Sequence, residues 1–193
     1  MVAIEPSAVM ITQRGSGSAP VVRGVAEALP FPDRSFDAVL AVLTTHHWSD
    51  RGTGLDELCR VAPVRVVLTF DPVVNARQWI VHDYVPEIGS FDAGRGSLEA
   101  MAEQLGARST VLPLTRDFQD GVLGAFWCRP FAYLDPAVRR HMSGFARLDP
   151  SVVDEAMGRL DDDLRSGAWD RRHRSLADVE AYDAGYRLLV SGR

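Results

Sequence analysis

Short apolar runs alternate with helical patterns along the first 114 residues, and this alternation restricts the fold more than any other feature. The runs expected to form strands are residues 2–4, 21–22, 36–43, 64–70 and 111–114. Between them, residues 7–14, 50–62 and 97–105 are expected to form helices, the last two because apolar side chains recur at helical spacing. Such alternation is typical of a doubly wound, mostly parallel sheet with helices on both faces. The sequence therefore predicts an α/β fold.

The second half of the chain, over residues 117–178, is expected to be mainly helical. Asp135 and Asp149 each stand before a proline, as an N-cap residue does when proline takes the first helical position. An apolar stripe follows, formed by Val153, Ala156, Met157, Leu160 and Leu164. Residues 186–190 then predict a last strand. We expect a core over residues 1–116, a helical lid inserted at 117–178, and a return to the core at 179–193.

The composition excludes several classes of protein. With 26 acidic and 21 basic residues the net charge is −5, whereas nucleic-acid-binding domains are normally basic. No apolar stretch approaches the ~18 residues that span a membrane, and Met1 is followed by no signal-peptide pattern. Cys59 and Cys128 lack a C-x-x-C partner and lie in apolar surroundings, as reduced core cysteines do. We expect a cytoplasmic protein that binds neither nucleic acid nor membranes.

Three segments with functional side chains follow predicted strands. Glu5 closes the first strand, residues 25–27 follow the second, and residues 43–48 follow the third. Ligands of doubly wound sheets bind outside the C-terminal ends of the strands. A carboxylate at the position of Glu5 has two oxygens that can accept hydrogen bonds from both hydroxyls of a ribose. The residues alone leave open whether Glu5 binds a nucleotide or only ends a strand.

A family resemblance rests on four strings: VAIEPS, GVAEALPFPDRSFDAVLAV, HHW and ELCRVAPVRVVLTFDP. Together they cover roughly residues 1–72, and they resemble the class I S-adenosylmethionine-dependent methyltransferases, most closely the ubiquinone and menaquinone biosynthesis branch. The resemblance implies a Rossmann-like fold with S-adenosylmethionine as cofactor and a small-molecule methyl acceptor. It places Glu5 at the ribose and Val25, Ala26 and Glu27 at the adenine. Val42 and Leu43 fall beside the methionine part of the cofactor.

The chain departs from that family at its beginning. Family members start with a strand and a D-x-G-x-G-x-G loop, which would precede residue 2 and which this sequence lacks. Glycine lets the backbone approach the cofactor closely. Without that central strand, the edges of strands 2–4 and 36–42 are expected to be unpaired and buried, at about 1–3 kcal/mol for each orphaned group. We therefore expect an N-terminally truncated chain in which the strand gap favours homo-oligomers. A smaller departure is Val25, which replaces an aspartate common in relatives.

Histidines are the candidate catalytic residues, and His47 is the one we select. His46, His47 and Trp48 follow the predicted central strand, and a histidine near neutral pKa can take a proton from a methyl acceptor. Both histidines can equally be structural or line the cofactor site. Adjacent side chains diverge and no carboxylate or cysteine stands at ligand spacing, so we predict no metal site. The isolated His82, His141 and His173, the acidic run 161–163 and the basic run 171–174 are expected at the surface.

Two further functions stay open from the sequence. A truncated chain without the glycine loop can be a non-catalytic protein that acts only as a binding partner. Glu5 also suits a dinucleotide-dependent oxidoreductase, although the string AEALPFPD does not. An in-frame upstream segment that encodes a strand and a D-x-G-x-G loop would favour the methyltransferase.

Overall fold

The computed structural model describes residues 1–91 and 96–192, and these form two compact units. The first unit comprises Met1–Thr69, Arg95–Thr110 and Arg187–Arg193. The second comprises Phe70–Gly94 and Val111–Tyr186. Each unit has its own cluster of buried apolar side chains, so each is described by itself.

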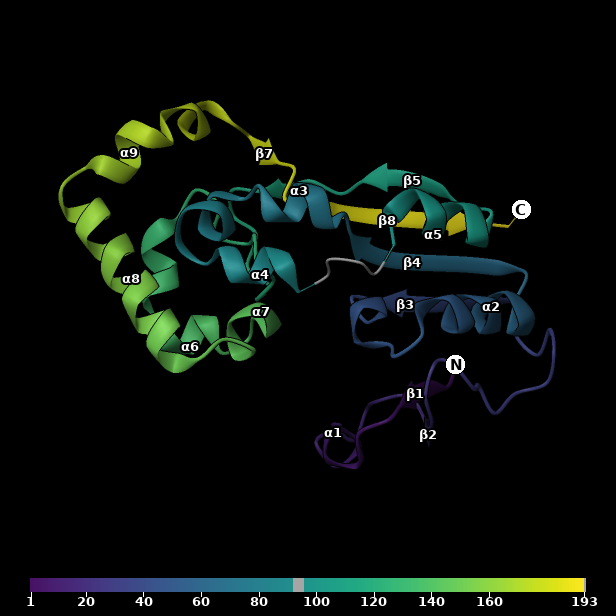
Figure 1. Cartoon of the computed structure of the whole chain (residues 1–193). Coiled ribbons are helices and arrows are strands. Elements are labelled where there is room, and N and C mark those ends of the chain that lie inside the picture. The colour runs from purple at the N-terminus through teal and green to yellow at the C-terminus, as the bar shows by residue number, and fades with distance from the viewer. Residues whose placement is uncertain (92–95, 193) are drawn as a thin grey trace. The chain divides into compact units, whose positions relative to one another are not determined.

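The first unit carries short strands in two separate sheets (Figure 1). A two-stranded sheet pairs β1 (Ala3–Glu5) with β2 (Val21–Arg23) in parallel, with helix α1 (Ala8–Thr12) between them in sequence. A four-stranded sheet has the order β3-β4-β8-β5, and β3 and β4 are parallel. Its strands are β3 (Ala38–Val42), β4 (Val64–Phe70), β8 (Tyr186–Ser191) and β5 (Arg108–Val111). The predicted α/β fold with a mostly parallel sheet is confirmed.

Strand β3 has one edge without a paired strand and one face that is exposed to solvent. Among the described residues, β3 pairs with β4 alone and β1 pairs with β2 alone, so each has one unpaired edge, as the sequence predicted. The expected burial does not extend to one face of β3, where Leu40 and Val42 expose 64% and 50% of their surface. Strands of such apolar composition normally lie inside sheets covered on both faces. Among the described residues, no element packs over the face of β3 that carries Leu40 and Val42, although its apolar composition is typical of a covered strand.

Helices α2 (Arg51–Val61) and α5 (Leu98–Leu105) supply the core of the first unit (Figure 1). The Asp50 side chain accepts a hydrogen bond from the N–H of Thr53 and caps α2, because the first helical N–H groups have no partner within the helix. Gly106, at φ 58°, ends α5 in the left-handed conformation that favours glycine. Leu55, Leu58, Met101 and Leu105 are buried together with Val67 of β4.

Arg60 of α2 holds the connection between β2 and β3. Its guanidinium donates to the carbonyl oxygens of Phe31 (2.7 Å) and Leu29 (3.0 Å) and pairs with Asp33 and Glu57. Glu57 in turn accepts from the N–H of Leu29 at 2.7 Å. Residues 29–33, which lead into β3, are thereby fastened to α2.

The second unit is mainly helical. Its elements before residue 120 are α3 (Pro72–Ala76), the π-helix η2 (Ile80–Tyr84), α4 (Pro86–Ser90) and strand β6 (Leu114–Thr115). Those after residue 120 are η3 (Pro130–Leu134), α6 (Pro136–Arg139), α7 (Ser143–Ala146), α8 (Pro150–Arg165), α9 (Ala168–Arg172), η4 (Arg174–Asp178) and β7 (Ala181–Tyr182). Strands β6 and β7 pair antiparallel. This unit takes in Phe70–Gly94 as well as residues 117–178.

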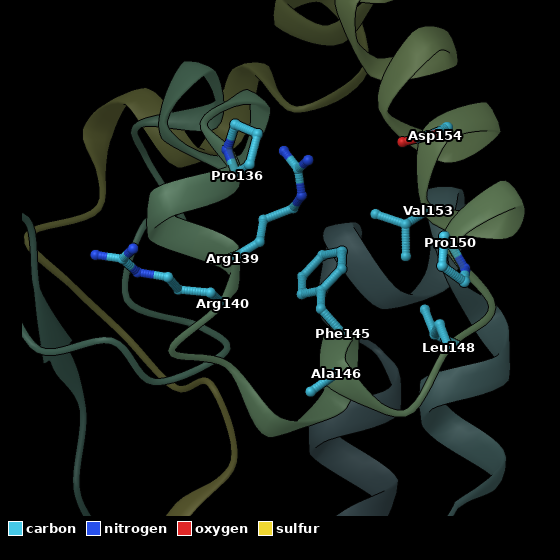
Figure 2. Close-up of a pocket in the computed structure, with 9 residues that line it drawn as sticks. All are labelled: Pro136, Arg139, Arg140, Phe145, Ala146, Leu148, Pro150, Val153 and Asp154. Carbon is cyan, nitrogen blue, oxygen red and sulfur yellow. The ribbon is translucent and has the colours of Figure 1, made fainter.

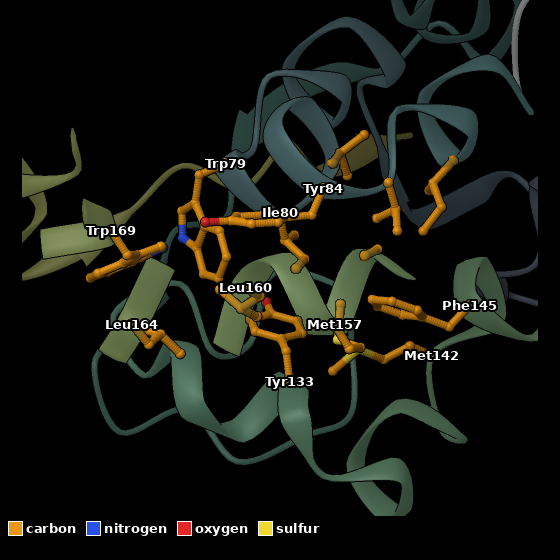
Figure 3. Close-up of a cluster of buried hydrophobic side chains, with 14 residues drawn as sticks. Trp79, Ile80, Tyr84, Tyr133, Met142, Phe145, Met157, Leu160, Leu164 and Trp169 are labelled. Carbon is orange, nitrogen blue, oxygen red and sulfur yellow. The ribbon is translucent and has the colours of Figure 1, made fainter. Parts of the chain in front are cut away.

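The core of the second unit is built around Trp79 (Figure 3). Its ring makes edge contacts with Tyr84, Tyr133 and Trp169 at centroid distances of 5.2–5.9 Å, and its Nε1 donates to the Trp127 carbonyl at 2.9 Å. The predicted stripe of α8 is confirmed, because four of its members are buried against this cluster: Ala156, Met157, Leu160 and Leu164. The predicted caps of α6 and α8 by Asp135 and Asp149 are confirmed too.

Candidate functional site

The first part of the candidate site lies at the C-terminal ends of β1 and β2. Because these strands are parallel and in register, Glu5 pairs with Arg23, and the N–H of Gly24 donates to the Glu5 carbonyl at 3.4 Å. Glu5 and the loop 24–27 are therefore brought together, as the sequence predicted. The Glu5 Oε1 accepts from the N–H of Ser7 at 2.8 Å, which fixes the carboxylate at the start of α1. Its Oε2 has no partner among the described residues, so one oxygen remains to accept from a ligand.

The three candidate residues of the loop after β2, Val25, Ala26 and Glu27, have different surroundings. Val25 exposes 46% of its surface, whereas Ala26 packs against the core of the first unit. Glu27 is engaged within the protein. Its Oε1 accepts from the N–H of Ser49 (2.6 Å), the hydroxyl of Ser49 (2.7 Å) and the N–H of Asp50 (3.1 Å).

The role of Glu27 follows from these bonds. Burial raises the pKa of Glu27, but the hydrogen bonds from Ser49 and Asp50 outweigh it, and the net pKa is lowered. The carboxylate is thus charged and ties the loop after β2 to the segment that leads into α2. Glu27 orders this edge of the unit, a function that its place in the sequence did not indicate.

The second part of the candidate site is the end of β3. Leu43 adopts φ 47°, a left-handed conformation that is uncommon for a leucine, and its N–H donates to the Leu68 carbonyl at 2.8 Å. Val42, one residue earlier, is half exposed. Strained backbone of this kind persists where the surroundings hold it, and it concentrates at ligand-binding positions. The strain at Leu43 supports its selection as a site residue.

His47 lies in the 3-10 helix η1 (Thr45–His47) directly after β3. Its ring is exposed and stands 3.9 Å from that of His46, centroid to centroid. The hydroxyl of Thr45 is buried and lies 3.0 Å from the hydroxyl of Thr69, which anchors the turn to the end of β4. Trp48 is buried against Gly54, where a Cβ would lie 2.5 Å from the indole. The anchors on both sides of His47 fix the backbone and leave its imidazole accessible.

Neither metal-binding groups nor membrane-spanning helices occur in the part of the chain that the structure describes. Over residues 1–91 and 96–192, no three side chains among His, Cys, Asp and Glu are grouped to hold a metal ion. Within the same ranges, every helix is too short or too polar to cross a bilayer.

A charged cluster in the second unit was not predicted from the sequence. The Asp83 carboxylate lies 2.9 Å from His173 Nε2 and 2.6 Å from His82 Nδ1. His173 also packs against the rings of Trp79 and Trp169 at 5.8 and 5.1 Å. The expectation that His173 is a surface residue is therefore wrong, because its side chain is only 15% exposed.

The acidic and basic runs contribute to the same cluster. Asp163 accepts from the Tyr84 hydroxyl (2.7 Å) and from Arg172 (2.6 Å), and Arg172 also approaches Asp83 at 3.4 Å. The two runs are thus not merely solvated. Asp163 and Arg172 meet because α8 and α9 turn back on each other at Gly167, which takes a left-handed φ of 68°.

We expect this cluster to make stability depend on pH. Burial lowers the pKa of His173 despite the attraction of Asp83, so the folded state binds the proton less readily than the unfolded chain, whose histidine pKa is about 6.5. The free energy of unfolding should therefore fall as pH drops through about 6.5, by at most about 1.4 kcal/mol per pH unit. Chemical denaturation between pH 7 and pH 5 measures it. His173→Gln should flatten the slope, and the exposed His141→Gln should not; an unchanged slope in His173→Gln would contradict the assignment.

Residues 1–65 match a family model described as a methyltransferase domain. The chain is also similar to a protein of Escherichia coli (strain K12) named "Uncharacterized protein YafE", at 46% identity over 39 residues. That match covers 20% of this chain and 19% of the E. coli protein, so this chain is aligned with less than a fifth of that relative.

Solved structures also resemble the chain over nearly its whole length, among them the following two. A putative methyltransferase from an antibiotic biosynthesis pathway of Anabaena variabilis has a TM-score of 0.91 and 29% identity, over 100% of this chain and 81% of that one. A putative methyltransferase in a complex with the Haloferax volcanii Trm112 methyltransferase activator has a TM-score of 0.50 and 17% identity, over 99% and 70%. The second likeness concerns the fold alone.

Proposed function

We propose that this chain, which has the fold of the class I S-adenosylmethionine-dependent methyltransferases, transfers a methyl group from S-adenosylmethionine to a small molecule. One observation carries the proposal. Glu5 stands at the C-terminal end of a parallel strand pair, with its Oε2 unengaged among the described residues and the loop 24–27 beside it. A ribose and an adenine need such a carboxylate and such a loop as neighbours.

Each site residue has a proposed role. Glu5 accepts hydrogen bonds from the ribose hydroxyls, and Val25 and Ala26 form an apolar contact for the adenine. Glu27 supports this loop through Ser49 and Asp50. Val42 and Leu43 bound the methionine part, where the left-handed backbone of Leu43 turns the chain away from the end of β3.

The chemistry requires a methyl donor and a route for one proton. S-adenosylmethionine, when bound, would supply a methyl group on a positively charged sulfur: the electrons of the broken carbon–sulfur bond would stay on sulfur, and a lone pair of the acceptor would form the new bond to carbon. Where the acceptor carries a proton, His47 takes it, since its imidazole is exposed and has a ring nitrogen that can accept a proton. The fixed turn around His47 serves positioning, which contributes most in reactions of this kind.

We further propose that the complete site needs a strand between β1 and β3. The open edges of these two strands and the exposed Leu40 and Val42 support a partner strand that pairs with both. A glycine-rich loop at its end would reach the cofactor more closely than side-chain-bearing backbone can. In this proposal the described chain belongs to a longer, ubiquinone-branch-like protein.

The methyl acceptor is proposed to be a small molecule, for which residues 117–178 provide selection. The Anabaena variabilis protein, 29% identical over the whole of this chain, is described as a putative methyltransferase from an antibiotic biosynthesis pathway, and small molecules suit that description. The net charge of −5 further disfavours a nucleic-acid acceptor. A cytoplasmic location fits the free cysteines, Cys59 and Cys128.

The proposal is tested by the effect of Glu5→Ala on cofactor binding. Loss of hydrogen bonds between a carboxylate and the ribose should weaken S-adenosylmethionine binding at least about tenfold, because bonds to charged groups contribute about 1.5–3 kcal/mol. Calorimetric titration with S-adenosylmethionine measures the dissociation constant. It uses the 193-residue chain or, if that chain does not bind, a chain extended upstream by a strand and a glycine-rich loop.

His47→Gln is the control for this experiment. It should leave the affinity for S-adenosylmethionine within about twofold, since a base that acts on the acceptor contributes to transfer rather than to cofactor binding. If Glu5→Ala and the unchanged chain bind S-adenosylmethionine with equal affinity, Glu5 does not bind the ribose. Absence of binding in both the short and the extended chain would remove the proposed function itself.

A further inference from the structure

The second unit carries a surface pocket of about 290 Å³ among its short helices, open to solvent on one side and called the cavity below (Figure 2). Its walls come from α6, α7 and the first turns of α8, together with the segments that join them. The volume lies just below the range typical of ligand sites, which is roughly 300–1,000 Å³. The cavity therefore suits a small organic molecule.

One wall of the cavity carries the guanidinium of Arg139. The side chain is half-buried and reaches from α6 toward the cavity, where one of its terminal nitrogens donates to the Tyr133 carbonyl at 2.5 Å (Figure 2). A guanidinium has five N–H donors, so most of those of Arg139 remain unused. No acidic side chain among the described residues lies within 4.0 Å of it. Burial lowers the pKa of Arg139 although the charges of Asp154 and Asp135 act in the opposite direction, so the loss of water outweighs the attraction of these two carboxylates.

The facing walls are apolar. Phe145 is buried in the core of the second unit and lines the cavity, and Leu148 and Val153 complete the apolar surface beside it. Figure 2 shows Phe145 and Val153 directed into the space that Arg139 enters. Arg140 also lines the cavity, but its side chain extends to the other side, and its Nε lies 3.2 Å from His141.

We propose that this cavity binds a small monocarboxylate with an apolar body. The planar carboxylate matches the fork of the Arg139 guanidinium, which it can engage through two parallel hydrogen bonds. The apolar body then covers Phe145, Leu148 and Val153. This inference is independent of the proposed methyl transfer, because the cavity belongs to the second unit alone and the ligand needs no cofactor.

The negative charge of Asp154 affects which anions the cavity can bind. Its exposed carboxylate lines the same space on α8 without pairing with Arg139. Asp154 attracts the Arg139 guanidinium through space, as does Asp135 at the start of α6, so these carboxylates disfavour a second negative charge on the ligand. Removal of the Asp154 charge should therefore strengthen the binding of a monoanion.

The test is a titration of the 193-residue chain, labelled with ¹⁵N, by phenylacetate, followed in two-dimensional NMR spectra. Phenylacetate should shift the amide signals of α6, α7 and the start of α8, with a dissociation constant in the millimolar range or tighter. Two comparison compounds separate the contributions, because phenylacetamide lacks the charge and acetate lacks the apolar body. Each should bind at least about tenfold more weakly, since a charged hydrogen bond or a buried ring contributes more than about 1.4 kcal/mol.

Three variants locate the ligand. Arg139→Gln should weaken phenylacetate binding at least about tenfold, and Asp154→Asn should strengthen it about two- to threefold. Arg140→Gln is the matched control, with the same charge change one residue away, and should alter affinity by less than about twofold. If Arg139→Gln does not fold, Arg139→Lys keeps the charge and loses only the two-pronged geometry, and it should still bind more weakly.

Other outcomes would overturn the proposal. Equal binding of phenylacetamide and phenylacetate would show that the guanidinium contributes nothing. Equal losses in Arg139→Gln and Arg140→Gln would indicate general attraction to a basic surface. Shifts confined to signals outside α6, α7 and α8 would place the ligand elsewhere.

Discussion

An upstream extension that encodes a strand and a glycine-rich loop is expected to tighten S-adenosylmethionine binding at least about a hundredfold over the 193-residue chain. The described residues supply the ribose carboxylate and the adenine loop, but β1 and β3 each present an unpaired edge. A strand between them would fix Glu5 relative to Leu43, and its loop would add backbone hydrogen bonds to a charged ligand. Two such bonds at about 1.5 kcal/mol each already account for a hundredfold change.

Calorimetric titration of both chains with the cofactor measures this difference. Amide hydrogen exchange provides a second readout, because pairing with a new strand should slow the exchange of open-edge amides in β3. An extension of equal length composed of glycine and serine is the control, and it should change neither quantity. A 193-residue chain that already binds at micromolar concentration, with the binding lost in Glu5→Ala, would show that the open edges do not limit the site.

The second large effect is expected for Trp79→Ala, which should lower the free energy of unfolding of the helical unit by about 3–5 kcal/mol. Trp79 is 5% exposed and contacts the rings of Tyr84, Tyr133 and Trp169. Its loss opens a cavity at the centre of the cluster in Figure 3 and leaves the buried Trp127 carbonyl without its indole donor. Urea denaturation followed by circular dichroism measures the change.

Phe131→Ala is the matched control for Trp79→Ala. Phe131 is also an aromatic residue of the helical unit, but it exposes 65% of its surface, so its removal should change the free energy of unfolding by less than about 0.5 kcal/mol. Similar effects of the two substitutions would mean that the helical unit is not organised around Trp79.

Local sequence patterns determined most of the elements. The strand β4 has the predicted bounds, and α2, α5 and α8 begin at the side-chain caps that Asp50, Ser97 and Asp149 supply. These features are set by nearest neighbours along the chain, since a cap satisfies N–H groups two or three residues away. Glu5 and loop 24–27 are brought together by the pairing of two short parallel strands, β1 and β2, which are joined only by α1 and its flanking loops.

Some local predictions failed because the signal was weak. The strand expected at residues 111–114 is in fact two strands, β5 (Arg108–Val111) and β6 (Leu114–Thr115), and β5 is exposed throughout. The helices between residues 72 and 90 were not assigned. They are only five residues long each, and one is a π-helix, so no helical stripe develops in the sequence.

Tertiary structure alone decided what the side chains do. The family resemblance placed Glu27 at the adenine, but in the fold its Oε1 accepts a hydrogen bond from the N–H of Ser49 at 2.6 Å, 22 residues away. His173 was expected at the surface, yet a contact across 90 residues buries it beside Asp83. Arg139 has no sequence motif at all and is defined by the cavity it enters. Such roles depend on which groups lose water together, and burial is a property of the packed chain, which no short window of sequence contains.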